Sequence, residues 1–144
     1  MQPFRMSALE LISAYRAREL SPVEAMGSVI ERVEAFEPHI HATWLFTPER
    51  ALDEARGSEA RFAKGEPIGP LDGVPVTIKD NIATRGDPKP IGTAAEDMTP
   101  QEADAPPAQR LREAGAIIFA KTTMPDYGML SSGLSSFHGL RASG

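Results

Sequence analysis

Apolar side chains recur at helical intervals along the first third of the chain. A serine stands three residues before a glutamate at Ser7 and again at Ser21, which is the spacing of a capping box, and an apolar stripe follows each pair. These patterns predict one helix over residues 7–20 and a second helix that ends near Phe36, before Pro38.

Short apolar runs farther along the chain predict strands. Segment 41–46 is aromatic and β-branched, and a helix that opens at Thr47 is expected to follow it. The run 116–120 is continuously apolar, and 74–78 is apolar except for Thr77, as in strands that are buried on both faces. Pro75 places the first of them at a strand start or at a sheet edge.

A helix is expected between these two strands, capped by Asp104 and closed by Gly115, which is suited to a left-handed position. The order strand, loop, helix, strand describes an α/β unit and favours parallel pairing of the two strands. The fold class is therefore α/β, and 144 residues make one domain or part of one.

Composition narrows the function classes. The chain has 20 acidic and 15 basic side chains, a net charge of −5 and no long block of like charge, which disfavours nucleic acid and anionic membranes as partners. It has no cysteine, which excludes a disulfide, a thiolate nucleophile and a cysteine metal site within these residues and suits a reducing cytoplasm. Charged residues interrupt the first apolar segment, so no signal peptide or membrane span is expected there.

Lys79 and Asp80 directly follow the apolar run 74–78. Ligands of open α/β sheets bind beyond the carboxyl ends of the strands, and burial there would lower the pKa of an ammonium until the amine could accept a proton. Alternatively, Lys79 reaches solvent or pairs with Asp80. These residues alone leave both interpretations open.

Histidines offer a weaker signal. His39 and His41 are two residues apart, so a strand would point both imidazoles to one face, as a metal pair requires. No third ligand stands nearby in the sequence, and His138 is isolated, so a pair of surface imidazoles is the favoured interpretation and no metal site is predicted. Trp44 is expected in the core.

Several linked segments resemble the amidase signature family of serine hydrolases. They run in order from about Gly69 to Gly139: PLDGVPVTIKDNI, Gly86, Gly92-Thr93, Asp104-Ala-Pro and RLREAGAIIFAKTTMPDYG. The resemblance implies the start of a mixed β-sheet flanked by helices after the N-terminal helices. Residues 1–144 would then be a single partial domain, with a mainly helical segment over 1–64 and the start of the α/β core over 65–144.

The same resemblance implies a chemistry. Lys79 aligns with the family's catalytic lysine, which accepts a proton relayed by one serine, in a cis peptide, from a nucleophilic serine that attacks a carboxamide. The products are a carboxylate and ammonia or an amine, and no metal or organic cofactor takes part. Asp80 would orient the loop or the lysine, or else be a solvated turn carboxylate. Ser131 or Ser132 would contact the substrate, or else cap a turn.

The family's GGSSGG segment, which carries both serines, does not occur in residues 1–144, and the resemblance fades after Arg141. We therefore expect the N-terminal part of an amidase that is inactive alone. The alternative is a non-catalytic remnant or interaction module, whose exposed sheet edges would favour self-association and a homo-oligomer. The stretch MLSSGLSSFHG favours stand-alone amidases over the glutamine-dependent transamidating branch.

Overall fold

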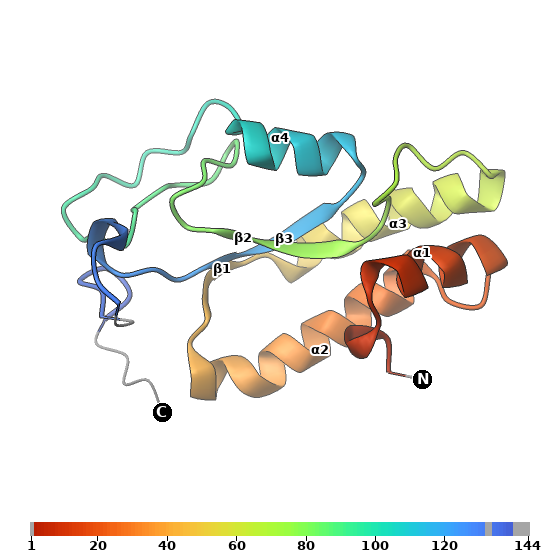
Figure 1. Cartoon of the computed structure of the whole chain (residues 1–144), viewed down its shortest axis with the longest axis horizontal. Coiled ribbons are helices and arrows are strands. Elements are labelled where there is room, and N and C mark those ends of the chain that lie inside the picture. Colours follow the sequence, from red (N-terminus) through yellow and green to blue (C-terminus); the bar gives the residue numbers. More distant parts are fainter. Residues whose placement is uncertain (1, 132–133, 140–144) are drawn as a thin grey trace.

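The computed structural model describes residues 2–131 and 134–139 (Figure 1). Within them, helices and strands alternate after two initial helices, and no helix is long and apolar enough to cross a membrane. The elements are 3₁₀ helix η1 (Pro3–Arg5), α1 (Ala8–Ala17), α2 (Pro22–Ile40), β1 (Thr43–Phe46), α3 (Pro48–Lys64), β2 (Pro75–Lys79), α4 (Pro106–Glu113), β3 (Ile117–Thr122) and 3₁₀ helix η2 (Asp126–Gly128).

Both predicted capping boxes are present. The Ser7 and Ser21 hydroxyls each accept a hydrogen bond from the amide three residues on, and each glutamate carboxylate accepts one from the serine amide. The predicted end of the second helix is wrong, because α2 passes through Pro38 to Ile40. A proline in the last turn removes only one helical hydrogen bond, and its φ is compatible with a helix.

The end of α2 also changes the place of the two neighbouring histidines. His39 lies in the last helical turn, and His41 is the C-cap in a left-handed conformation with φ 48°. β1 begins only at Thr43, so the predicted strand start at His41 is wrong and the two imidazoles do not share a strand face. The amide of His41 bonds Glu37 O, and the amide of Thr43 bonds the Glu37 carboxylate, which together close the helix.

The sheet has the order β1-β3-β2. β2 pairs with β3 in parallel, as predicted, and β1 pairs with β3 antiparallel, so the sheet is mixed. The parallel register contains a bulge: Val76 pairs with Ile118 but Thr77 pairs with Ala120. β3 therefore holds one extra residue, which changes the face to which its last side chains point.

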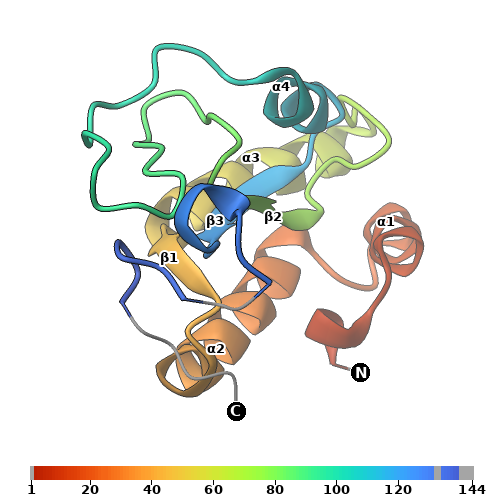
Figure 2. The same ribbon diagram turned by 60° about the vertical axis from the view of Figure 1, so that its left-hand side comes forward.

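Helices cover both faces of this sheet, as Figures 1 and 2 show with α4 on one side and α2 on the other. Met26 of α2 and Ala51 and Ala55 of α3 pack against Ile117 and Phe119 of β3. On the opposite face, α4 contributes Ala108 to a cluster with Ile78 and Ile118. α1 packs beside the start of β2, where Tyr15 and Val74 share a third cluster.

The helix between the two parallel strands is present, but its predicted cap is wrong. Ala105 is the N-cap of α4, while the Asp104 carboxylate accepts from the amide of Arg85 and forms an ion pair with Arg112. Gly115 follows the helix with φ +90°, as predicted. A Cβ there would lie 2.6 Å from the Cα of Asp72, so a side chain does not fit.

Candidate active site

Lys79 is the last residue of β2 and lies opposite Thr122 of β3. Its backbone is fixed on both sides, because the amide of Asp80 donates to Thr122 O over 3.1 Å and the amide of Ile82 donates to Lys79 O over 3.0 Å. The side chain is exposed, so in the described residues the amine is not buried but reaches solvent, as in the alternative interpretation. Within 2–131 and 134–139, no ion pair joins Lys79 to Asp80.

Asp80 is fully buried, which makes the alternative of a solvated turn carboxylate wrong. Its oxygens accept from the amide of Ile91 at 3.2 Å, from the amide of Gly92 at 2.7 Å and from His138 Nε2 at 3.1 Å. The residue after Lys79 therefore fastens a distant turn of the loop between β2 and α4, and with it the segment that contains His138.

Lys121 is the buried lysine at the carboxyl end of β3, the central strand, with 1% of its surface exposed, and no pattern in the sequence indicated its burial. Because of the bulge, Lys121 pairs with Ile78 and faces the side of the sheet opposite to Lys79. Its Nζ donates to Ile82 O at 2.8 Å and to Thr84 Oγ1 at 3.3 Å.

Burial lowers the pKa of the Lys121 ammonium, and the nearby carboxylates of Asp80 and Asp87 offset only part of that effect. The Thr84 hydroxyl donates in turn to Asp87 Oδ2 at 2.9 Å. Arg50 of α3 binds the same carboxylate with two hydrogen bonds of 3.0 and 3.3 Å. A continuous polar chain thus runs from β3 through the loop to α3.

His138 and Ser135 are also buried polar residues, and no pattern in the sequence indicated their burial. The Ser135 hydroxyl accepts from the amide of His138 at 3.0 Å and donates to Gly92 O. Apart from the bond between these two residues, their contacts with Gly92 and Asp80 join positions far apart in the chain, so no local spacing could have indicated them.

The expected core position of Trp44 is only partly right, because the side chain is half-buried. It packs edge-on against Phe137, with ring centroids 5.3 Å apart. Beside them lies a cavity of about 320 Å³, lined by His41, Thr43, Trp44, Thr123, Phe137 and His138. In the described part of the chain, no group of three or more histidine and acidic side chains could hold a metal ion.

Of the two serines expected to contact the substrate, Ser131 makes no contact with Lys79 in the described residues. Ser131 is exposed, and Ser132 lies outside the described residues. The neighbouring Ser136 binds the Asp126 carboxylate through both its amide and its hydroxyl, at 2.8 and 2.9 Å. The roles of Ser131 and Ser132 in substrate binding stay predictions.

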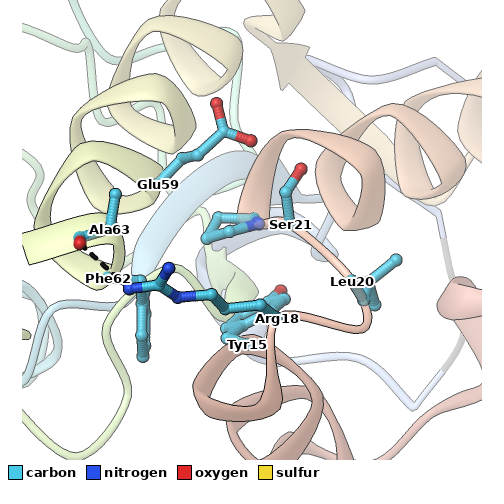
Figure 3. A pocket seen from close by; sticks show the side chains of 8 residues that line it. Tyr15, Arg18, Leu20, Ser21, Glu59, Phe62 and Ala63 are labelled. Carbon is cyan, nitrogen blue, oxygen red and sulfur yellow. Dashed lines mark hydrogen bonds between the residues drawn. The ribbon is translucent and has the colours of Figure 1, made fainter. Parts of the chain in front are cut away.

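A further hollow of about 200 Å³ lies between α1 and α3 (Figure 3). Tyr15 and Phe62 form its apolar wall, with their ring centroids 5.4 Å apart. Arg18 crosses its mouth and donates to Ala63 O over 3.2 Å. These helices lie beside the start of β2, so this hollow is separate from the carboxyl end of the strand.

Known proteins resemble this chain over nearly its whole length. The family model "Amidase" matches residues 24–140. The A subunit of glutamyl-tRNA(Gln) amidotransferase from Acidothermus cellulolyticus is 38% identical over 135 residues, which are 94% of this chain and 27% of that relative. The chain thus spans about 27% of the length of such curated relatives.

Solved structures agree in fold. A structure described as an amidase matches with a TM-score of 0.84 and 32% identity, over 93% of this chain and 30% of that one. The native peptide amidase from Stenotrophomonas maltophilia matches with a TM-score of 0.79 and 27% identity, over 88% and 26% of the two chains. Relatives of both branches are found, so the preference for stand-alone amidases stays a prediction. The family model and the fold together establish that the chain belongs to the amidase family.

Proposed function

We propose that Lys79 is the base of an amide-hydrolysing site in the complete protein. A serine from outside residues 1–144 attacks the carboxamide carbon, and a second serine, in a cis peptide, relays its proton to the neutral amine of Lys79. The C–N bond breaks as an ester to the first serine forms, and the amine leaves with a proton. Water then hydrolyses the ester to the carboxylate.

The position of Lys79 is the observation that carries this proposal. The residue lies at the carboxyl end of a parallel strand, and its backbone is held by hydrogen bonds on both sides. Its side chain is exposed, so the amine is accessible to groups from outside these residues. A base of this kind works best when its pKa is lowered by burial. Residues beyond this chain, which would carry the two serines, must therefore cover the amine.

Other parts of the proposal rest on the likeness to the amidase family. Asp80 orients the loop behind Lys79, and Ser131 and Ser132 line the substrate side. The substrate is a small-molecule amide cleaved in the cytoplasm without a cofactor, by a stand-alone amidase that can form a homo-oligomer. Residues 1–144 by themselves are inactive, because no GGSSGG segment occurs in them.

A chimera tests the role of Lys79 directly. Residues 1–144 would replace the matching segment of the peptide amidase from Stenotrophomonas maltophilia, and hydrolysis of a peptide amide would be measured. Lys79→Met should lower kcat by about a thousandfold, which is the usual range for loss of a general base. Lys64→Met, at the exposed end of α3, is the matched control and should leave the rate unchanged. A folded chimera that is inactive, or one that tolerates Lys79→Met, would contradict the proposal.

One observation favours the second candidate function, an interaction module. Large apolar side chains lie open to solvent near the end of the described chain, with Met129 81% exposed and Leu130 half exposed. Size-exclusion chromatography with light scattering tests this alternative. A dimer of residues 1–144 that Met129→Glu separates into monomers would support the module, and a stable monomer would argue against it.

A further inference from the structure

We propose that Lys121 is a positioning residue whose ammonium holds the turn that carries Lys79. This inference rests on the proposed function of Lys79. Lys121 projects from the opposite face of the sheet, so it does not approach the reacting atoms. It acts through the backbone of residues 79–84.

The first support is the geometry of the turn. The amide of Ile82 bonds Lys79 O, and the carbonyl of the same residue accepts from Lys121 Nζ at 2.8 Å. Both polar groups of Ile82 are thus used, one to close the turn and one to fasten it to β3. Together with the bond from Asp80 to Thr122, the turn is tied to the neighbouring strand at its start and at its end.

The second support is the burial of the charge. An ammonium placed out of water is costly unless it finds strong partners, and an apolar side chain would fill the same space without that cost. Lys121 nevertheless occupies this position at 1% exposure, and its ammonium donates hydrogen bonds to Ile82 O and Thr84 Oγ1. The polar chain continues from Thr84 through Asp87 to Arg50, so the loop is anchored to α3 as well.

Hydrogen exchange of residues 1–144 tests the anchoring without any need for catalysis. Lys121→Met should speed exchange of the amides in 80–87 by about tenfold or more, while the amides of α2 keep their protection. Lys64→Met is again the control. Unchanged exchange in 80–87 would overturn the proposal. If Lys121→Met does not fold, Thr84→Val is used in its place, because it keeps the lysine but removes one acceptor of its ammonium. Unchanged exchange of the amides in 80–87 in that variant would also overturn the proposal.

Kinetics in the active chimera test the positioning of Lys79. Lys121→Met should lower kcat by about 10- to 100-fold, as expected for a base displaced by a fraction of an ångström to an ångström, with KM altered by less than about twofold. Rates are normalised to active sites titrated with a fluorophosphonate, so a loss of folded protein does not imitate the effect. An unchanged kcat per active site would refute the inference while the unsubstituted chimera still supports the proposed function. A chimera without activity would instead count against the role of Lys79. The hydrogen-exchange experiment would still test whether Lys121 holds residues 80–87.

Discussion

Removing the carboxylate of Asp72 should destabilise this chain far more than removing an exposed carboxylate from a similar pair. Asp72 is fully buried and accepts from Arg61 Nε at 2.8 Å, from Arg61 Nη2 at 2.6 Å and from the amide of Ile68 at 2.9 Å. These contacts fasten the glycine- and proline-rich loop between α3 and β2. In Asp72→Ala, the Ile68 amide loses its partner and the loop loses its tie to the helix.

The size of the effect follows from the exposure of the two partners. Breaking a buried ion pair by removing one member costs about 3–5 kcal/mol when the other charge stays buried. The Arg61 side chain is 32% exposed and can turn toward water, so we expect the lower end, about 3 kcal/mol of the free energy of unfolding. Asp53 pairs with Arg56 on the same helix but is 76% exposed, and Asp53→Ala should cost no more than about 0.5 kcal/mol.

Urea unfolding of residues 1–144 measures both values. Trp44 is the single tryptophan, so its fluorescence and the far-ultraviolet circular dichroism provide two probes of one transition. Arg61→Ala and the double variant complete a cycle that isolates the coupling between Arg61 and Asp72. Equal losses for Asp72→Ala and Asp53→Ala, or a coupling near zero, would refute the reasoning that burial decides the strength of these pairs.

Three further predictions concern stability. Burial raises the pKa of the Asp72 carboxyl, but its hydrogen bonds to the arginine and to a backbone amide outweigh this and leave the pKa below its usual range. The stability from this group is therefore present above the unfolded pKa of about 3.9 and is lost as the pH falls through the folded value, so acid titration of unfolding should be less steep in Asp72→Ala. Gly115→Ala should cost more than about 2 kcal/mol of the free energy of unfolding, because its Cβ meets the Asp72 backbone. Gly86→Ala, which has a similar φ of +86° but open space around it, should cost about 1 kcal/mol. Thermal or urea unfolding measures both, and equal costs would contradict the close contact. Burial raises the pKa of the Tyr15 phenol, whose hydroxyl donates to Gly73 O at 3.2 Å, so the stability from this group is complete below the unfolded pKa of about 10 and is lost as the pH rises above it. Tyr15→Phe should cost about 1 kcal/mol of the free energy of unfolding at neutral pH and should flatten the loss of stability in alkali. An alkaline loss as steep as in the unsubstituted chain would count against this reasoning.

Local signals predicted much of the fold. The serine caps of α1 and α2, the helix between the parallel strands and the left-handed Gly115 all depend on residues a few positions apart, and the structure confirms them. The failure at Pro38 is local, because a proline in the last turn removes only one helical hydrogen bond. The failure at Asp104 arises where a tertiary contact competes with a local preference. Asp104 serves an amide of the distant loop and not the first turn of α4.

The candidate site shows where such reasoning stops. One interpretation of the sequence placed a buried lysine at a strand end, and the buried lysine of the described residues is Lys121, not Lys79. The face to which Lys121 points depends on a bulge, which no spacing in the sequence reveals. The burial of Asp80 was equally hidden, because its partners Gly92 and His138 come from loops far along the chain.

The bulge in β3 also prevents repulsion between two lysines at the carboxyl ends of β2 and β3. In a regular parallel ladder that continued from the Val76 and Ile118 pair, position 121 would stand directly across from position 79. Two ammonium groups would then be neighbours on one face, with Cβ atoms about 5 Å apart, and would repel each other. The inserted residue sends one cation into the interior and leaves the other at the surface, so two lysines of adjacent strands can serve different purposes at the same end of the sheet.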